Sequence, residues 1–198
     1  MRIIAGRLRS RTFVAPAGLA TRPTSDRLRE TLFNVLAPRI EGAALLDLYA
    51  GSGAVGIEAL SRGAAQATFV ERAPPALKVL RANLDRLGLT VGSCVEAGSV
   101  DAFLRRASKA KCAGFGLIFL DPPYDAVEEY AATLGLLGGP AVNVLAAGGL
   151  IVAEHRRKQR LAELYGALVR TRLIEQGDAG LSFYAIGPHA VSGDATQQ

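Results

Sequence analysis

The sequence predicts an α/β protein in which a mixed β-sheet is covered by helices on both faces. From residue 43 onward, short apolar runs alternate with amphipathic stretches. Strands with wholly apolar interiors are typical of parallel sheets that are buried on both faces. The chain closes with two further apolar segments that have the pattern of an antiparallel pair. We therefore expect a Rossmann-like sheet of seven strands, preceded by a short N-terminal β extension.

The size and composition of the chain are those of an ordinary globular protein. Its 198 residues, 49% hydrophobic and 21% charged, favour one domain with a small addition. No apolar run approaches the roughly 20 residues that cross a bilayer. Arginines interrupt each apolar run near the N-terminus, so we expect no signal peptide and a cytoplasmic protein. We divide the chain into a basic arm with its connector (1–23), a single domain (24–188) and a disordered tail (189–198).

The individual elements follow from hydrophobic spacing and from helix start and stop residues. Residues 2–14 are expected to form a β-hairpin or short β arm, and 26–37 an amphipathic helix that Pro38 ends. The Pro- and Gly-rich segment 14–24 connects them. Further strands are expected at 43–50, 67–71, 92–97, 115–120, 148–155, 166–174 and 181–187, and further helices at 53–62, 74–87, 100–109, 125–137 and 157–164.

The sequence does not indicate a metal site. Cys94 and Cys112 lack the spacing of metal ligands and have no neighbouring histidine, so we expect buried or inert thiols. His155 and His189 cluster neither with these cysteines nor with paired carboxylates, which argues against zinc.

The first 39 residues carry all of the net positive charge. Eight arginines and two acids give +6 there, whereas 15 basic and 16 acidic side chains in the other 159 residues give −1. Arginine pairs with phosphate through its planar fork and stacks on bases. A solvated surface is the alternative, but we favour a polyanionic partner, most simply nucleic acid. A second basic run, 155–160, is interpreted mainly as solvated surface. The expected contacts in the first segment include Arg2, Arg7, Arg9, Arg11 and Arg27.

Residues 45–59, LLDLYAGSGAVGIEA, contain the first chemical motif. Gly51, Gly53 and Gly56 form a G-x-G-x-x-G pattern between an expected strand and an expected helix. Glu71 follows at the end of the next strand, as in dinucleotide sites where glycines allow close approach and an acid binds a ribose. The alternative is a structural glycine turn, with Glu71 serving only as a carboxylate at a helix start.

Asp47 separates these possibilities. A pyrophosphate favours bare backbone at a helix N-terminus, and a carboxylate four residues before the first glycine would repel it. A cationic ligand is favoured instead, and S-adenosylmethionine carries both an ammonium and a sulfonium. The pattern D-x-x-x-G-x-G resembles motif I of the class I S-adenosylmethionine-dependent methyltransferases. The resemblance implies that Asp47 binds the methionine amino group, that Gly51 and Gly53 let the backbone pass beneath the ligand, and that Glu71 accepts ribose hydroxyls.

The second motif, Asp121-Pro122-Pro123-Tyr124, follows an apolar strand. It resembles the [D/N]-P-P-[Y/F/W] motif of methyltransferases that modify exocyclic amines of bases. Such an amine is a poor nucleophile because its lone pair is delocalised into the ring. Acceptors on Asp121 and on the Pro122 carbonyl would draw the nitrogen toward tetrahedral geometry, and Tyr124 would stack on the base. Alone, the motif fits a simple turn, but its position at the same sheet edge as the first motif favours a site.

Several segments together resemble the RsmD-type methyltransferases, which methylate N2 of a guanine in bacterial small-subunit ribosomal RNA. The most specific is 21–36, TRPTSDRLRETLFNVL, which generic methyltransferases do not carry. The resemblance extends from Met1 to about Gly187. It implies a class I methyltransferase fold, S-adenosylmethionine as cofactor and a monomer that acts on 16S rRNA in the small subunit or its assembly intermediate. The segments are 1–11, 21–36, 45–64, 69–72 and 117–124.

The resemblance also implies roles for individual residues. Asp121, Pro122 and Tyr124 carry over as the catalytic and base-stacking residues. Arg22 and Thr24 match the RPT step of the family, which borders the active site, so Arg22 would hold a cofactor carboxylate or an RNA phosphate. The chain departs from the family after the third strand, where an Asp near the adenine is replaced by Ser99, a weaker hydrogen-bonding partner. The expected cofactor contacts are Asp47, Tyr49, Gly51, Gly53, Glu71, Arg72 and Ser99.

Two other functions fit parts of the pattern. A DNA adenine-N6 or cytosine-N4 methyltransferase uses the same amine motif, but this chain has no spare segment for a separate target-recognition region. A non-catalytic RNA-binding assembly factor would retain the fold, but Asp47 and Asp121 would then be dispensable, and both are present.

Overall fold

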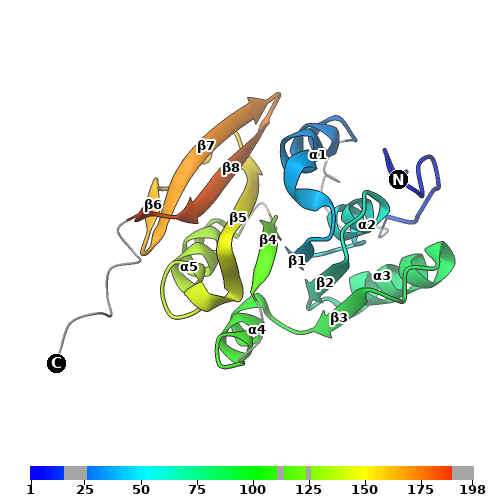
Figure 1. Cartoon of the computed structure of the whole chain (residues 1–198), viewed down its shortest axis with the longest axis horizontal. Helices are drawn as coiled ribbons and strands as arrows, with labels where there is room; N and C mark the ends of the chain where they lie inside the picture. Colours follow the sequence, from blue (N-terminus) through cyan, green and yellow to red (C-terminus); the bar gives the residue numbers. More distant parts are fainter. Residues whose placement is uncertain (16–25, 111–113, 124–125, 189–198) are drawn as a thin grey trace.

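The computed structural model describes residues 1–15, 26–110, 114–123 and 126–188. Its centre is an eight-stranded sheet with the order β3-β2-β1-β4-β5-β8-β7-β6 (Figure 1). The first five strands in the chain run parallel, and the last three are antiparallel. The Rossmann-like mixed sheet is thus confirmed, with one strand more than predicted. The strands are β1 (Ala44–Leu48), β2 (Gln66–Glu71), β3 (Ser93–Ala97), β4 (Phe115–Leu120), β5 (Leu145–Arg156), β6 (Leu164–Tyr165), β7 (Leu168–Gln176) and β8 (Ala179–Ile186).

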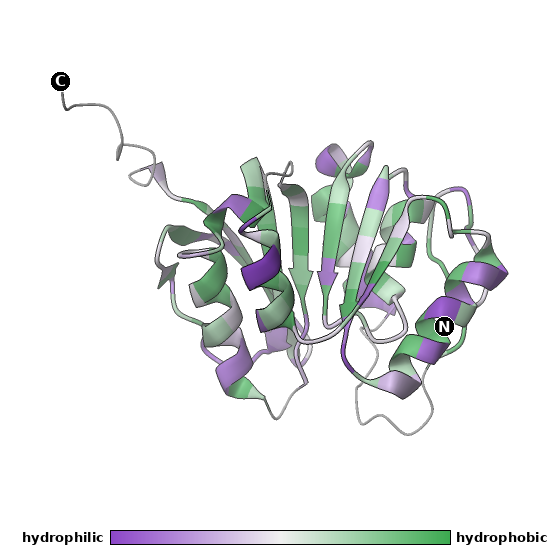
Figure 2. Ribbon diagram, turned by 90° about the horizontal axis from the view of Figure 1, so that it is seen from below, coloured by the Kyte–Doolittle hydropathy of each residue, from purple (hydrophilic) through white to green (hydrophobic). Residues whose placement is uncertain are grey.

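Helices cover both faces of the sheet. Along β1, Leu45 packs in one core cluster with side chains of α1, α2 and α3, whereas Leu46 packs in a second with α4 and α5. This alternation is the period-two pattern of a strand buried on both sides. Figure 2 shows the largely hydrophobic strands at the centre, with hydrophilic residues on the outer sides of the helices. The helices are α1 (Asp26–Ile40), α2 (Ala54–Ser61), α3 (Pro74–Leu87), α4 (Val100–Ala107), α5 (Val127–Leu137) and the 3₁₀ helix η1 (Val142–Val144).

The N-terminal arm folds back on itself and docks on α2. An antiparallel bridge joins Arg2 to Thr12. The backbone N–H groups of Ile4 and Ala5 donate to the two carboxylate oxygens of Glu58, at 2.8 and 3.0 Å. Glu58 is buried in α2, so its carboxylate holds the arm against the domain. The predicted β extension is therefore present, as a hairpin-like arm with a single bridge.

The attachment continues along the arm at close range. Gly6 has φ +81°, and a β-carbon there would collide with the backbone carbonyl of Ser61. Further along, Asn83 of α3 accepts from the N–H of Val14 at 2.9 Å and donates to its carbonyl at 2.9 Å. Only glycine allows the close approach of Gly6 to Ser61. The side-chain amide of Asn83 fixes Val14, at the far end of the arm.

Two expectations about helices are wrong: the end of one helix and the existence of another. Helix α1 passes through Pro38 and ends at Ile40. Proline removes one backbone hydrogen bond of the helix there, but Ile40 is buried in the core. Among residues 157–164 there is no helix. Instead, the carbonyls of Leu161 and Ala162 accept from the side chains of Arg170 and Tyr184, so tertiary contacts replace helical hydrogen bonds. This segment leads into β6, the additional strand.

Cys94 is exposed rather than buried. Partial burial is the main cause that raises the pKa of its thiol, and the nearby carboxylate of Glu96 raises it further. The raised pKa disfavours the reactive thiolate. The described residues contain no group of three or more metal-binding side chains that could hold an ion. In the same part of the chain, every helix is too short or too polar to cross a bilayer. Residues 16–25, Cys112, His189 and the expected tail lie outside the described residues.

Candidate active site at the carboxyl edge of the sheet

Four segments of the chain meet at one edge of the sheet. Parallel register places Leu48 of β1 beside Val70 of β2 and Leu120 of β4, and Glu71 beside Ala97 of β3. The loops that follow these strands therefore emerge together. The predicted convergence of both motifs on one edge is confirmed.

Asp47 is buried at this edge, with 2% of its surface exposed. Its Oδ2 accepts from the backbone N–H of Gly56 at 3.0 Å, in the first turn of α2. Burial raises the pKa of Asp47 to about 7 despite this hydrogen bond, and the charge of Glu71 adds to the rise. A buried carboxylate of this kind is stabilised in its ionised form by a cation.

Glu71 holds the glycine loop and the start of α3. Its Oε2 accepts from the N–H of Gly51, while Oε1 accepts from the N–H groups of Arg72 and Ala73, all at 2.8 Å. The helix-start role that was the alternative interpretation of Glu71 is thus present. Oε1 already accepts two hydrogen bonds, whereas Oε2 has a second acceptor direction, so contact with a ribose stays a prediction.

The three glycines of the first motif differ in what surrounds them. Gly51 has φ +56°, and a β-carbon there would meet no atom of the described residues within 4 Å. At Gly53, with φ +84°, a β-carbon would lie 2.5 Å from Leu80 Cδ1, and at Gly56 it would collide with the ring of Phe69. The backbone is therefore open to a ligand at Gly51. At Gly53 the close packing against Leu80 of α3 excludes a β-carbon, and contact of its backbone with a ligand stays a prediction.

Tyr49 connects the glycine loop to α5. It has φ +65°, a strained conformation for a side chain of this size. Its hydroxyl donates to Glu129 Oε2 at 2.7 Å and lies 2.7 Å from Thr133 Oγ1. Burial raises the pKa of Tyr49. Arg72 Nη1 lies 3.8 Å from the same Glu129 carboxylate, so both residues predicted as cofactor contacts border α5.

Asp121 stands at the end of β4, followed by the buried Pro122. Burial raises the pKa of Asp121 well above its ordinary range, and the charges of Glu154 and Asp47 raise it further. The second motif therefore faces the acids of the first across the edge. Tyr124 lies outside the described residues, as do Arg22 and Thr24.

Ser99 caps α4, where its Oγ accepts from the N–H of Ala102 at 3.3 Å. Its hydroxyl proton is still available to an acceptor on a ligand. Asp101, two residues on, pairs with Arg105 at 2.9 Å on the exposed side of the helix, and so does not replace the missing acid. The contact with the adenine stays the least specified part of the predicted site.

The arginines of the first segment separate into exposed and buried groups. Arg7, Arg9, Arg11 and Arg27 are exposed, and Arg2 pairs with Asp26 at 3.2 Å. Arg29, by contrast, is fully buried. It donates to the carbonyl of Arg2 at 2.7 Å and to Asp26 at 3.0 Å, and lies 3.9 Å from Glu58. Counting Arg29 among the cations that face a polyanion was therefore wrong, because it holds the arm against α1 and α2.

Sequence reasoning missed Glu154. Ala153 of β5 is in register with Leu120, so the next residue along each strand brings Glu154 beside Asp121. Glu154 is buried, and its charge acts on Asp121. Its place at the carboxyl end of the fifth parallel strand is the signal that could have identified it.

Comparisons with known proteins agree with this architecture. A family model described as Conserved hypothetical protein 95 matches residues 1–185. The chain is 41% identical over 184 residues to "Putative rRNA methyltransferase YlbH" of Bacillus subtilis (strain 168), covering 93% of this chain and 98% of that protein. It is 40% identical over 124 residues to "Ribosomal RNA small subunit methyltransferase D" of Escherichia coli (strain K12), a match that covers 63% of this chain and 60% of that protein.

Solved structures give the same result. "Putative methyltransferase yhhF from Escherichia coli" superposes with a TM-score of 0.78 at 34% identity, over 93% of this chain and 96% of that one. A hypothetical protein of Thermus thermophilus also gives a TM-score of 0.78 at 34% identity, over 92% and 98% of the two chains. The likeness therefore extends over nearly the whole of each chain.

Proposed function

Because the chain belongs to the RsmD-type family of methyltransferases, we propose that it transfers a methyl group from S-adenosylmethionine to the exocyclic N2 amine of a guanine in 16S rRNA. The observation that carries this proposal is the cluster of Asp47, Glu71 and Asp121 at the carboxyl edge. Burial raises the pKa of Asp47 and of Asp121, and the charges of neighbouring acids add to the rise: Glu71 at Asp47, and Glu154 and Asp47 at Asp121. Such a cluster favours a cationic ligand beside a hydrogen-bonding partner for an amine.

The residues at the edge fit the cofactor. S-adenosylmethionine, when bound, supplies an electrophilic methyl group on a sulfonium. Asp47 would hold the α-ammonium, which relieves the repulsion among the buried acids. Gly51 leaves the backbone open to the ligand, and Glu71 would accept a ribose hydroxyl with the remaining acceptor direction of Oε2. Ser99 and Arg72 would contribute at the adenine end.

Asp121 and Pro122 would act on the base. In its ionised form Asp121 accepts an N–H of the guanine amine, and the carbonyl of Pro122 accepts the other. A cation near Asp121 lowers its raised pKa and so favours the ionised carboxylate, the form that accepts a hydrogen bond. Positioned acceptors of this kind orient the nitrogen lone pair, so most of the catalysis is positioning and electrostatics. Tyr124 would stack on the base.

The RNA partner is inferred from relatives that are named as methyltransferases of small-subunit ribosomal RNA. We propose the small subunit or its assembly intermediate as the substrate, with the protein acting as a monomer. The exposed arginines of the arm are suited to phosphate contacts.

The test is methyl transfer from labelled S-adenosylmethionine to small subunits isolated from a strain that lacks the activity. Digestion of the labelled rRNA to nucleosides should yield N2-methylguanosine, and primer extension maps the position. If duplex DNA acquired the label and the small subunits did not, the result would instead support a DNA amine methyltransferase. Absence of S-adenosylmethionine binding in a calorimetric titration would favour a non-catalytic RNA-binding factor.

A further inference from the structure

The outward face of α3 is cationic. Lys78, Arg81 and Arg86 are exposed along it, with Asp85 as the one exposed acid of the helix. At about 100° per residue, the three cations fall within roughly 140° of the helix circumference. They extend over about 12 Å of its length, at 1.5 Å per residue. None of them belongs to the arginine-rich segment that the sequence singled out.

These three cations are not neutralised by neighbours. Among the described residues, none of them forms an ion pair with a carboxylate. Helix α4, on the opposite face of the sheet, shows the contrast. There Arg105 pairs with Asp101 at 2.9 Å and Arg106 with Glu96 at 2.6 Å. The charge on α3 is therefore available to a partner, whereas that on α4 is largely balanced.

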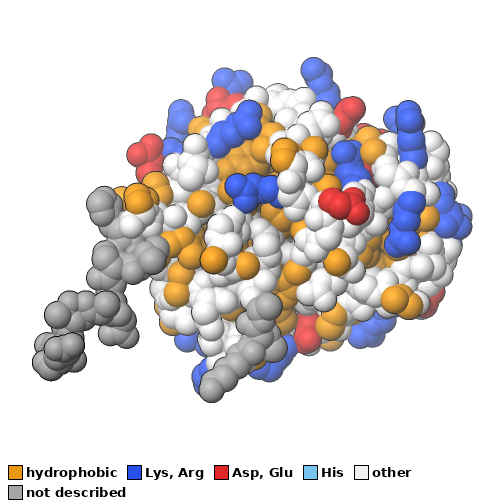
Figure 3. All heavy atoms as spheres, in the orientation of Figure 1, with side chains coloured by type: hydrophobic (Ala, Val, Ile, Leu, Met, Phe, Trp, Pro, Cys, Tyr) orange, Lys and Arg blue, Asp and Glu red, His pale blue; other side chains and the backbone are white. Residues whose placement is uncertain are grey.

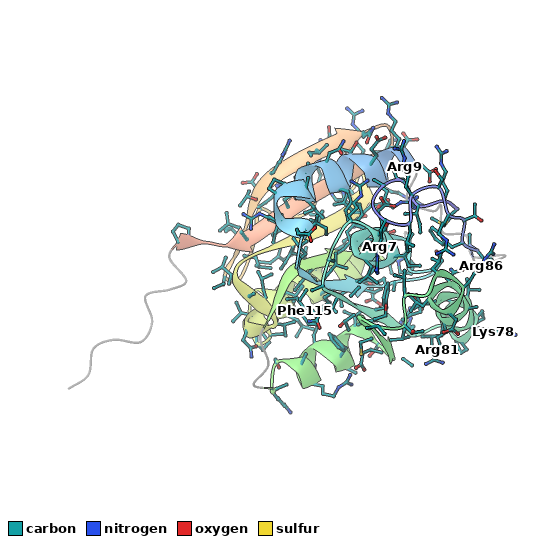
Figure 4. All side chains as sticks on the ribbon, turned by 45° about the vertical axis from the view of Figure 1, so that its right-hand side comes forward. Arg7, Arg9, Lys78, Arg81, Arg86 and Phe115 are labelled. Atoms are coloured by element: carbon teal, nitrogen blue, oxygen red, sulfur yellow. The ribbon has the colours of Figure 1, made fainter. Side chains whose placement is uncertain are left out.

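The arm lies against α3 and extends its charge. Arg11 Nη1 reaches the carbonyl of Leu87, the last residue of α3, at 3.5 Å. Asn83 of the same helix bonds both backbone groups of Val14. Figure 3 shows blue side chains along this edge of the molecule, and Figure 4 shows the labelled cations of the arm and α3 on the same side. We call this the α3–arm surface; it consists of Arg7, Arg9, Arg11, Lys78, Arg81 and Arg86.

The α3–arm surface begins beside the candidate active site and leads away from it. Helix α3 starts just after Glu71, and its 14 residues span about 21 Å. The arm contacts Ser61 at the end of α2, which is the end remote from the glycine loop. A bound polyanion on this surface would therefore run from the carboxyl edge of the sheet toward the opposite edge.

We propose that the α3–arm surface binds the phosphate backbone of the substrate RNA on a segment that flanks the target guanine. The inference rests on the proposed function and adds α3 to the arm as an RNA-binding element. Phosphates fit the exposed Lys and Arg side chains, which lie on a rigid helix and on an arm fixed by Glu58 and Asn83. Contacts of this type supply affinity and orientation without reading the sequence.

The test compares two triple variants that remove the same charge. The first is Lys78→Gln, Arg81→Gln and Arg86→Gln on α3. The matched control is Arg105→Gln, Arg106→Gln and Lys109→Gln, around the paired cations of α4. The affinity for 16S rRNA transcribed in vitro is measured by filter binding as a function of salt concentration. Because the α3 variant removes three cations that bind phosphate, the slope of log K against log[salt] should become shallower by about 2 to 3. The control should retain the wild-type slope.

Further measurements separate the possible outcomes. A charge-retaining variant, Lys78→Arg with Arg81→Lys and Arg86→Lys, should keep the wild-type slope. Thermal unfolding and S-adenosylmethionine affinity should match wild type in every variant. The inference would be overturned if the α3 variant kept the wild-type slope, or if the slope of the control became shallower by the same amount. In either case, methylation by the wild-type protein would still support the proposed function. A wild-type protein that neither binds the transcript nor methylates small subunits would instead refute the proposed function.

Discussion

The backbone N–H of Gly51 donates to Oε2 of Glu71 at 2.8 Å. This hydrogen bond joins the loop after β1 to the end of β2, the two places where a cofactor would be held. Because the other oxygen of Glu71 accepts from the first N–H groups before α3, one carboxylate fixes both loops. Substitution of Glu71 should therefore affect both stability and cofactor binding.

Glu71→Ala should weaken S-adenosylmethionine binding and lower the free energy of unfolding by about 1–3 kcal/mol, since three backbone donors lose their acceptor. Calorimetric titration and chemical denaturation measure the two effects. Glu71→Gln keeps one side-chain oxygen and should fall between Ala and wild type. Unchanged cofactor affinity in Glu71→Ala would restrict Glu71 to its structural role.

Asp121→Ala should leave cofactor affinity nearly unchanged and reduce turnover by about 100-fold or more, as removal of a positioned polar group commonly does. Single-turnover methyl transfer to small subunits measures the rate. Asp121→Asn retains a carbonyl acceptor and should reduce turnover less. Turnover equal to wild type in Asp121→Ala would remove Asp121 from the mechanism.

Cofactor binding should strengthen with pH, because Asp47 has its pKa raised to about 7 and only its ionised form attracts the ammonium. Between pH 6 and pH 8 the ionised fraction rises about tenfold, so the affinity should rise by about that factor. Titration calorimetry across this range measures it. A pH-independent affinity would mean that Asp47 does not contact the cation.

The same residue should affect stability in the opposite direction. The pKa of Asp47 is raised in the folded state, so the folded protein binds more protons than the unfolded chain between about pH 4 and pH 7. The free energy of unfolding should therefore fall as pH rises through this window. In Asp47→Asn this contribution is removed and the fall should be smaller; an equal fall would locate the titration elsewhere, for example at Asp121.

Glu58→Ala should destabilise the protein by about 3–5 kcal/mol, because it leaves the buried guanidinium of Arg29 without its nearest buried acid and releases the arm. Urea denaturation followed by circular dichroism measures the destabilisation. Glu30→Ala, which removes an exposed acid from α1, is the matched control and should change little. Equal effects of the two substitutions would contradict the anchoring role of Glu58.

Replacing Arg7, Arg9 and Arg11 with Gln should weaken rRNA binding and make its salt dependence shallower by about 2 to 3 in log–log slope. The side chains are exposed, so the fold should be retained. Filter binding at several salt concentrations tests this, with the α4 triple variant as reference. Insensitive binding would leave the arm with a structural role alone.

Local signals predicted the parts of the fold that depend on neighbouring residues. Helix α3 was predicted at 74–87 and lies there, because Pro74 and Pro75 preorganise its first turn and Gly88, with φ +67°, ends it. The same holds for β4, whose apolar run stops at the prolines of the second motif. The rule that ligands bind beyond the carboxyl ends of parallel strands then predicted that Asp47, Glu71 and Asp121 lie at one edge of the sheet.

Contacts between distant segments were not predictable in this way. Leu80 fills the space beside Gly53, and nothing near Gly53 in the sequence indicates it. Arg29 is different, because it lies three and four residues before the buried Leu32 and Phe33 and therefore on the apolar stripe of α1. Helical spacing could have marked it as buried, but the charge count alone did not distinguish it from the exposed arginines.

Asn83 donates to the carbonyl of Ser52 in the glycine loop at 3.1 Å as well as bonding Val14 of the arm. One buried side chain is thus shared by the segment suited to the cofactor and the segment suited to RNA. Two ligands bound to these segments would be coupled through Asn83 if binding of one of them shifted this contact. Any factor by which the cofactor tightens RNA binding must equal the factor by which RNA tightens cofactor binding. Asn83 would set that cooperativity without touching either ligand.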